Sequence, residues 1–525
     1  MPRSESILPF VMHLVPWLAA LSYLAGAMSI RAHMAAPRPI WETARRWASV
    51  ALAAALLPGA LLIAGRIAQL PEAPASPGAI LAAAMLALAG TIGLVVTRYS
   101  AVYLEGEPGQ PQYAADLLTT LAAICAVPAA DNLPLLLLAW ALASRSFHRL
   151  LLFYPDRPGA RLAAHKKLMT GRIAEVALAG AITLIGLRTG SWNIPEIAAW
   201  LARHRADMAI QAAAVLLVAG VALKTAQLPA HGWILQVMEA PTPVSALLHA
   251  GIVNLGGYVL LQLAPLLDAA LPARILLVAI GGTTAILAAL TMLTRVSIKV
   301  RLAWSTCAQM GFMLVECGLG FHGLALMHLI GHALYKAHAF LGAGSAVEQQ
   351  VLERGFGTDR SNASWPVQLI ALPAAAALVA ANLAPWRLLG AEALPWTWLA
   401  VLGVAWTPLL AQCPVRSAAA WFRGVLQLSL LTQLYLALHA TFGGTFAPTP
   451  SSPSPVLGLA GLLALLAVAQ AALPRTRSVR LRQLAYAGLY LDDWLTRLAL
   501  RWRPRPRPVP AAAAAAGKPM LEGEL

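Results

Sequence analysis

The sequence contains few charged residues. Aspartate, glutamate, lysine and arginine make up 11% of its 525 residues, whereas an ordinary soluble domain carries roughly 25%. Hydrophobic residues account for 59% and fall into repeated blocks of about 20, the length that crosses ~30 Å of hydrocarbon. The alternation that marks membrane β-strands is not seen, so helices must satisfy the backbone. The composition therefore predicts an all-α polytopic membrane protein.

Cysteine is also scarce, and the four cysteines are isolated from one another. Cys125, Cys307, Cys317 and Cys413 lie in or beside apolar segments. None is paired at the Cys-x-x-Cys spacing of a zinc site, and the pattern is not that of a disulfide framework. We therefore interpret them as small buried side chains and expect no metal or cofactor on this chain.

Apolar segments long enough to be transmembrane helices number about 14 to 15. They lie near residues 7–30, 49–67, 78–97, 113–127, 132–153, 172–188, 207–228, 241–267, 273–294, 301–320, 322–345, 366–383, 394–412, 421–441 and 455–473. Lysine and arginine gather in alternate loops, at 31–46, 157–167, 295–301 and 354–360. The positive-inside rule makes that side cytoplasmic, which predicts a periplasmic N-terminus and a cytoplasmic C-terminus in a bacterial inner membrane. The net charge of +16 therefore reflects cations gathered in the cytoplasmic loops of a membrane protein and does not indicate nucleic-acid binding.

The C-terminal region differs from the rest of the chain. Residues 475–502 combine arginine with leucine, tyrosine and tryptophan at mixed helical spacing, which predicts an amphipathic helix on the cytoplasmic surface. The low-complexity run RPRPRPVPAAAAAAG from Arg503 predicts disorder.

The sequence contains few lysines, and half of them lie in or at the edge of apolar spans. There are six lysines against 32 arginines, and Lys224, Lys299 and Lys336 lie in or at the edge of apolar spans. A desolvated lysine can lose its proton, whereas arginine effectively cannot. An ionisable group within a membrane span marks an ion path by default, the alternative being a lysine that extends to the membrane surface. We expect these three to take part in ion translocation.

Proline interrupts the seventh span. Pro229, Pro241 and Pro243 follow Lys224 closely, and each removes a backbone donor. Broken helices in transporters mark ion or substrate sites, because the freed backbone groups need protein or water around them. A plain turn between two helices is the alternative, and proline placement alone does not separate the two.

The eleventh span carries a row of titratable groups. His328, His332 and Lys336 are spaced i, i+4 and i+8, so they share one helix face. Histidine is the natural proton relay because its reference pKa is near 6.5. A metal site is disfavoured because no carboxylate lies nearby in sequence, and structural hydrogen bonding remains an alternative. His249 in the eighth span, close to Thr242 and Ser245, is a further candidate relay.

Three long segments resemble a known family. They are KTAQLPAHGWILQVMEAPTPVSALLHAGIVNLGGY from Lys224, SIKVRLAWSTCAQMGFM from Ser297 and HLIGHALYKAHAFLGAGS from His328. The chain is identified by them as a member of the antiporter-like membrane subunits, which include large subunits of respiratory complex I and Mrp-type antiporters. The resemblance implies two inverted five-helix repeats, each with a broken helix, at 113–268 and 273–412. Helices at 1–112 and 413–473 would flank them, and 474–525 would hold the surface helix and tail.

The sequence departs from that family at two places. The family usually has a glutamate directly after the tryptophan of the fifth span, paired with the lysine of the broken helix, but Ala141 follows Trp140. Nearby polar residues include His148, and Glu175 in the sixth span is our candidate counter-charge for Lys224. The second broken helix, expected at 394–412, contains no lysine.

One branch of the family fits these features best. RLLLFYPDRPGA from Arg149 and YAGLYLDDWLTRLALR from Tyr486 resemble the membrane subunit of the DAB inorganic-carbon accumulation complexes. That resemblance implies a non-enzymatic subunit that couples proton or sodium flow to CO2 hydration by a large cytoplasmic, zinc-containing DabA-type partner resembling a carbonic anhydrase. The alternatives are an Mrp-type cation/proton antiporter, a complex I-like proton-pumping subunit, or a membrane scaffold without ion flow.

Overall fold

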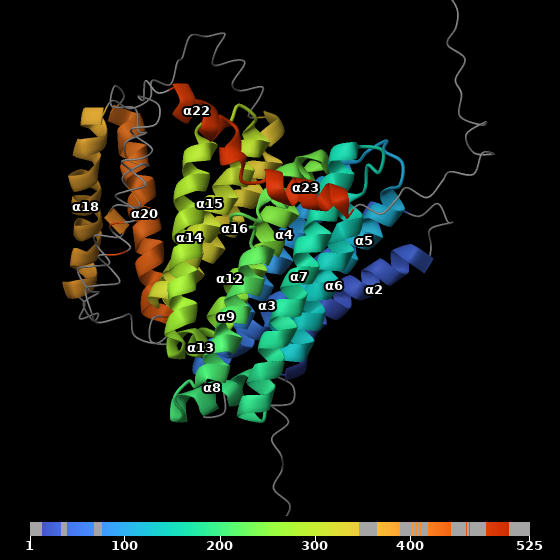
Figure 1. Ribbon diagram of the computed structural model, residues 1–525, viewed down its shortest axis with the longest axis horizontal. Coiled ribbons are helices and arrows are strands. Elements are labelled where there is room, and N and C mark those ends of the chain that lie inside the picture. Colours follow the sequence, from blue (N-terminus) through green and yellow to red (C-terminus); the bar gives the residue numbers. More distant parts are fainter. Residues whose placement is uncertain are drawn as a thin grey trace, which may run out of the picture.

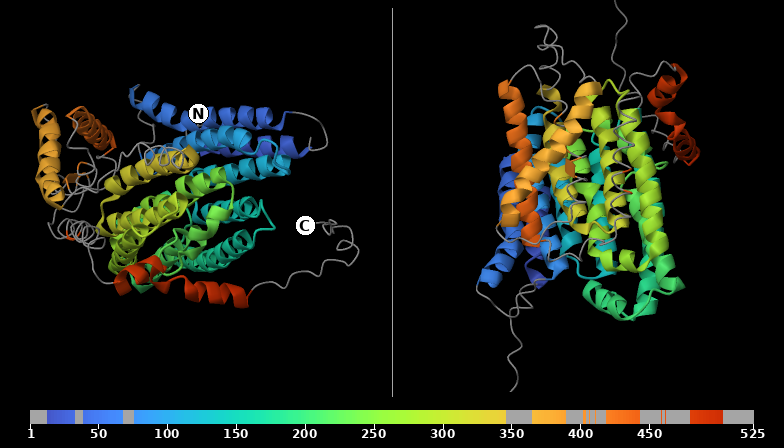
Figure 2. Two further views of the ribbon diagram at one scale, coloured as in Figure 1. Left: turned by 90° about the horizontal axis from the view of Figure 1, so that it is seen from above. Right: turned by 90° about the vertical axis from the view of Figure 1, so that its left-hand side faces the viewer.

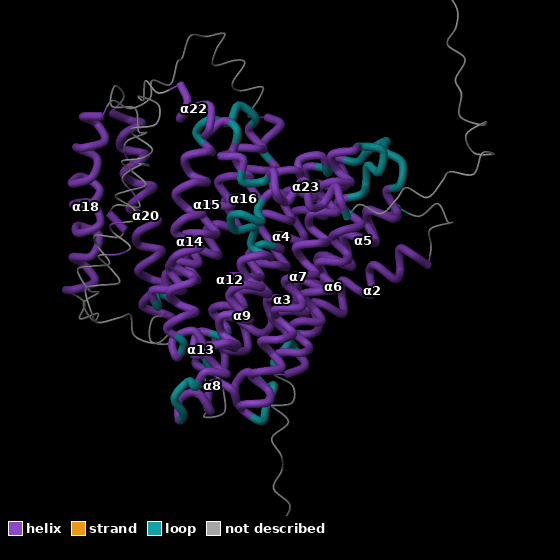
Figure 3. The backbone as a smooth tube through the Cα atoms, viewed as in Figure 1, coloured by secondary structure: helices purple, strands orange, loops and turns teal. Residues whose placement is uncertain are grey.

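The computed structural model describes residues 13–32, 39–67, 76–345, 365–388, 402–403, 406, 410, 418–442, 458, 461 and 479–502. Helices account for the secondary structure throughout these ranges, and no β-strand occurs in them. Most helices run side by side as a bundle (Figure 1), and most described loops gather at its two ends (Figure 3). The predicted all-α class is confirmed. Six helices in the described part are long and apolar enough to cross a membrane.

The first half of the bundle consists of the helices nearest the N-terminus. It contains α2 (Trp17–Ala32), α3 (Ile40–Ile67), α4 (Pro77–Tyr103), α5 (Gln110–Ala129), α6 (Leu133–Leu151), α7 (Pro158–Thr189), α8 (Ile194–Arg203) and α9 (Met208–Lys224). Polar caps begin several of these helices. The Asn132 side chain accepts from the Leu135 amide at 2.9 Å, and Asp207 accepts from the Ile210 amide at 3.0 Å.

The second half begins with short helical pieces and continues with long helices. It contains α10 (Gly232–Gln236), a 3₁₀ turn (Val237–Glu239), α11 (Thr242–Leu247), a π-helix (Leu248–Ile252), α12 (Asn254–Gln262), α13 (Ala264–Ala269), α14 (Leu271–Met292), α15 (Ile298–Leu319) and α16 (His322–Leu341). Next come α18 (Trp365–Leu388), α20 (Ala418–Phe442), α22 (Val479–Tyr486) and α23 (Asp493–Arg501). Seen from above, α18 and α20 stand at one edge of the molecule (Figure 2). The spans predicted at 394–412 and 455–473, and the tail from 503, lie largely or wholly outside the described residues.

The sixth span predicted from the sequence, at 172–188, begins later than the helix that the structure shows there. The sequence suggested a loop up to residue 171, but α7 starts at Pro158 and runs 32 residues. Proline is well suited to the first helical turn, and the following lysines do not end a helix whose polar groups find partners inside the protein. Lys166 and Lys167, assigned to a cytoplasmic loop, are therefore buried helix residues with 0% and 5% exposure.

The helix break after Lys224 lies inside the protein. Between α9 and α10 the chain leaves the helical path, and α10 and the 3₁₀ turn then lead to α11. Most side chains of this stretch, including Gln227, His231 and Trp233, are buried. The freed Leu228 amide donates to the Thr284 hydroxyl of α14 at 3.1 Å. A break whose backbone groups are satisfied by neighbouring helices favours the broken-helix interpretation over a plain surface turn.

Two glycines allow α14 and α15 to touch. A Cβ at Gly281 would lie 2.4 Å from the carbonyl oxygen of Gly311, and a Cβ at Gly311 would lie 2.6 Å from that of Gly281. Both obstacles are backbone atoms, so no rotamer change could relieve the clash. The helices would have to separate, which would disturb the wall that α14 and α15 form beside the break.

We expect Gly281→Ala to lower the stability of the detergent-solubilised chain by about 1–3 kcal/mol, the usual range for overpacking. Thermal unfolding followed by tryptophan fluorescence would measure it. Gly331→Ala is the matched control, because Gly331 is an exposed helical glycine of α16 with no atom within 4 Å of the added Cβ. Equal losses in both variants would contradict the proposed helix contact.

Candidate functional site

Lys224 is the last residue of α9, and its amino group is held by a carboxylate from α7. Its Nζ lies 3.3 Å from Oε1 of Glu175, whose other oxygen accepts from Arg172 at 2.8 Å. The side chains of Lys224 and Glu175 are 4% and 15% exposed. The Trp140 ring centroid lies 4.8 Å from the same Nζ, a cation–π distance. The counter-charge suggested for Lys224 is thus in contact with it.

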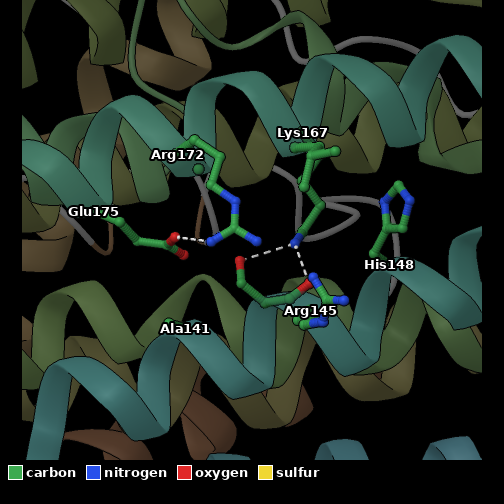
Figure 4. Close-up of a pocket in the computed structure, with 9 residues that line it drawn as sticks. Ala141, Arg145, His148, Lys167, Arg172 and Glu175 are labelled. Carbon is green, nitrogen blue, oxygen red and sulfur yellow. Dashed lines mark hydrogen bonds and ion pairs between the residues drawn. The ribbon is translucent and has the colours of Figure 1, made fainter. Parts of the chain in front are cut away.

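Beside this pair is a pocket between α6 and α7 (Figure 4). Its lining consists of Ala141, Ser144, Arg145, His148, Lys167, Leu168, Gly171, Arg172 and Glu175. Lys167 points across it and donates to both the carbonyl oxygen and the hydroxyl of Ser144 at 3.1 Å. His148 shares this pocket, and its buried Nδ1 has no hydrogen-bond partner.

Ala141 lies in the wall of this pocket. Ala141 contributes no charge to the wall where a carboxylate was expected, and the carboxylate present instead comes from Glu175 on the facing helix. That carboxylate lies between two cations, Arg172 and Lys224. Because a guanidinium effectively never loses its proton, Lys224 is the member of this group able to release one.

A second buried group lies where α11 to α16 meet. Lys336 on α16 is fully buried, and its Nζ donates to the Ser305 hydroxyl at 2.7 Å and to the Leu302 carbonyl at 3.4 Å, both on α15. Its hydrogen-bond partners are neutral oxygens, and within the described part of the chain no carboxylate forms an ion pair with it. Lys336 lies close enough to act electrostatically on His249 and His332.

The hydrogen bonds of His249 and His332 define which nitrogen carries the hydrogen. The Thr306 hydroxyl donates to the Leu302 carbonyl, so it accepts from Nδ1 of His249 at 2.9 Å. The Asn254 amide group donates to the Ala250 carbonyl, so its oxygen accepts from Nδ1 of His332 at 3.0 Å. Both neutral imidazoles therefore keep Nε2 as a proton acceptor.

His328 has a carboxylate partner that sequence proximity did not reveal. Its Nδ1 lies 2.9 Å from Oε2 of the buried Glu316, which α15 carries one helix earlier. The sequence showed no carboxylate close to the histidine row along the chain, but helix packing brings Glu316 of the preceding helix into contact with it. The described residues still contain no group of three or more histidine, cysteine, aspartate or glutamate side chains placed to hold a metal.

The segment from 248 to 262 connects the two groups. Its π-helix carries His249, whose ring stacks on Phe340 with centroids 4.2 Å apart. On α12, Asn254 contacts His332, and Gly256 packs against the Thr225 side chain next to Lys224. Lys299 lies apart from both groups, donating to the Thr242 hydroxyl at 2.8 Å. The predicted residues therefore form two clusters and one separate contact.

Sequence reasoning missed several residues of these clusters. Lys167 looked like a loop cation because it follows another lysine, and Ser305, Thr306 and Asn254 are common neutral residues. Glu316 carried a signal, since a carboxylate within an apolar span is costly without a partner. That signal could have placed Glu316 among the candidates.

The part of the chain that holds the two clusters also matches known proteins. Residues 130–368 match the sequence family described as NADH:quinone oxidoreductase/Mrp antiporter, transmembrane region. The chain is 39% identical to the probable inorganic carbon transporter subunit DabB of Hydrogenovibrio crunogenus, over 80% of this chain and 82% of the relative. It is 32% identical to subunit L of the NADH-quinone oxidoreductase of Escherichia coli, over 52% of this chain and 46% of the relative.

Solved structures share the architecture. The Mrp complex of Dietzia matches 97% of this chain and 60% of its own chain, with a TM-score of 0.60 and 22% identity. The membrane-bound sulfane sulfur reductase, an archaeal respiratory complex, matches 92% of this chain and 99% of its own, with a TM-score of 0.58 and 17% identity. At these identities the likeness establishes the fold alone.

We expect Glu175→Gln to destabilise the chain by up to roughly 3 kcal/mol, because it leaves two cations without their carboxylate. The double variant Glu175→Gln/Lys224→Met should lose less than Glu175→Gln alone, since one orphaned cation is gone. Thermal unfolding in detergent measures both.

Glu196→Gln is the control, because that carboxylate is exposed and bonded to the neutral side chains of Ser191 and Asn193. It should have little effect. Purely additive losses from Glu175→Gln and Lys224→Met would contradict a coupled pair.

Proposed function

The chain belongs to the antiporter-like family of membrane subunits, among the inorganic carbon transporter subunits DabB, and from this premise we propose that it couples an ion gradient to inorganic-carbon accumulation. Its relatives support the role of an ion-translocating membrane subunit. The proposal adds the coupled process: CO2 is hydrated to bicarbonate by a partner subunit, and the ion flow through this chain drives it in one direction.

The observation that carries the proposal is the buried pair at the helix break. Glu175 lies between Arg172 and Lys224, and Lys224 is where α9 ends. When Lys224 releases a proton, Arg172 keeps the carboxylate neutralised, so the change leaves no isolated buried anion. When Lys224 takes up a proton, the same carboxylate stabilises the ammonium. The site can therefore alternate between two states without moving a large element.

The second cluster offers the continuation of the path. His249 and His332 both present Nε2 as a proton acceptor, and Lys336 lies beside them on α16. An imidazole that accepts at one nitrogen and releases from the other moves a proton without net change. We assign His328 and Lys299 supporting places in the path, with Glu316 as the carboxylate that positions His328.

We place the catalysis on the partner. A large cytoplasmic, zinc-containing DabA-type subunit would hydrate CO2, and this chain would supply energy coupling in a bacterial inner membrane. The end of the bundle where α22 and α23 lie (Figure 1), which also carries Lys166 and Arg295, would then face the cytoplasm. The N-terminus would be periplasmic, and the two five-helix repeats would span 113–268 and 273–412.

An Mrp-type antiporter or complex I-like pump is the second candidate. It is favoured by the match of residues 130–368 to a family that both groups share. Ala141 counts against it, because the glutamate expected at that position for those proteins is replaced by a carboxylate on another helix.

Lys224→Ala should reduce carbon uptake by whole cells to the level of cells lacking the chain, because the titratable group at the break is gone. Uptake of labelled inorganic carbon, with and without uncoupler, measures this. Arg203→Gln is the control, since Arg203 is an exposed cation on α8. Normal uptake by Lys224→Ala would remove this residue from the path, and uncoupler-insensitive uptake would favour a scaffold role.

Purification of the complex in mild detergent tests the partner. We expect a single large soluble subunit to co-elute, with zinc in a one-to-one ratio to that subunit by elemental analysis. Co-elution of flavin and iron–sulfur subunits, or of several small membrane subunits, would instead support the redox or antiporter role.

A further inference from the structure

The C-terminal segment returns to the bundle and packs against the end where the helix breaks. α23 lies across α7, with Leu495 and Ala499 buried (Figures 1 and 2). Upstream, the Ala485 carbonyl accepts from the Thr294 hydroxyl at 3.3 Å and from Arg295 at 3.5 Å. The segment is thus attached to the body on both sides of residues 488–492.

This attachment brings a carboxylate to the break. Oδ2 of Asp492 lies 2.6 Å from Nζ of Lys166, and it also accepts from the Thr496 hydroxyl at 3.1 Å. Lys166 is fully buried, whereas Asp492 keeps 24% of its side chain exposed. A Cβ added at Gly232 would lie 1.4 Å from Oδ1 of Asp492, so the carboxylate rests directly on the backbone of α10. Asp492 therefore has access both to water and to the interior.

Several polar atoms in this region are buried without a hydrogen-bond partner among the described residues. Oδ1 of Asp492 and Nε2 of His231, the residue directly before α10, are two of them. His231 is fully buried, and the next residue, Gly232, is in contact with Asp492. Its Nδ1 lies 3.3 Å from the Pro229 carbonyl, which can only accept, so Nδ1 carries the hydrogen and Nε2 is a free acceptor. The carboxylate of Asp492 thus contacts Gly232 at the break, directly beside His231 with its unpaired acceptor nitrogen.

We propose that Asp492 and His231 form the terminal proton-exchange site of the path, with the carboxylate supplied by the C-terminal segment. Water at that face protonates the carboxylate of Asp492, whose side chain is 24% exposed, and the carboxylic acid passes the proton through a bridging water to Nε2 of His231. The imidazolium then releases the hydrogen on Nδ1 to a water in the broken segment that begins at Lys224, and the ring regains its starting tautomer when the remaining hydrogen moves from Nε2 to Nδ1 through water. Each group returns to its starting protonation, and Lys166 holds the carboxylate in place. This inference rests on the ion-translocating role proposed above.

The test separates proton exchange from simple attachment. Asp492→Asn keeps the size of the side chain and can still accept from Lys166 and Thr496, but it cannot titrate. We expect at least a tenfold loss of carbon uptake by the complete complex, and Asp492→Glu should restore most of it. Asp493→Asn is the matched control, because Asp493 is the exposed neighbouring acid on the same segment. It should leave uptake unchanged.

Reactivity of Lys166 reports whether the segment stays in place. Because its side chain is 0% exposed, an amine-specific reagent followed by mass spectrometry should label it only when the segment lifts away. Asp492→Asn with protected Lys166 and normal uptake overturns the proposal. If Lys166 becomes labelled in that variant, His231→Gln decides, since His231 belongs to the body. A tenfold loss there supports the exchange site, and normal uptake overturns it.

Lys224→Ala, measured in parallel, distinguishes failure of the exchange site from failure of the whole ion path. Loss of uptake in Lys224→Ala together with normal uptake in His231→Gln and in a protected Asp492→Asn would overturn the exchange site alone. Normal uptake in all three would overturn the ion-translocating path itself.

Discussion

The cost of an unpaired ammonium group inside a membrane protein governs the arrangement of this molecule. Lys224 ends a helix within the bundle, where a lone charge is expensive. Glu175 from the neighbouring α7 offsets that cost, and Arg172 offsets the cost of Glu175. Both residues lie in the middle of the long helix α7. The break after Lys224, the pocket beside α6 and the close contact of α12 all surround this one compensated charge.

Much of the fold could be predicted because the hydrophobic pattern follows the membrane thickness. Apolar runs fixed the positions of α4, α5 and α14 to within a few residues, and prolines marked the interruption after Lys224. The start of α7 could not be predicted by the same pattern. Lys166 and Lys167 look like loop residues in sequence. Their burial depends on hydrogen bonds from Lys166 to Asp492 and from Lys167 to Ser144. The short amphipathic α8 was missed because it is too brief to resemble a span.

The candidate site was predictable where chemistry alone singled residues out. Scarce lysines within apolar runs and the His328–His332–Lys336 row are unusual enough to stand out in any sequence. Their partners were not, since Ser305, Thr306 and Asn254 are ordinary residues whose role depends on helix rotation. Glu175 was named because the missing glutamate at Ala141 required a replacement. The ion path itself remains a prediction for all eight residues, of which seven lie in two clusters and Lys299 lies apart.

The ion pair between Lys166 and Asp492 has a consequence for biogenesis. The two residues are 326 positions apart, so the ribosome makes the lysine long before the aspartate. At about 5–20 residues per second, roughly 16 to 65 seconds of synthesis separate them. During that time α7 enters the membrane with an amino group whose final partner does not exist. The early helices must therefore insert before the partner of Lys166 has been made. The first half of the bundle reaches its final packing only after α23 has been translated.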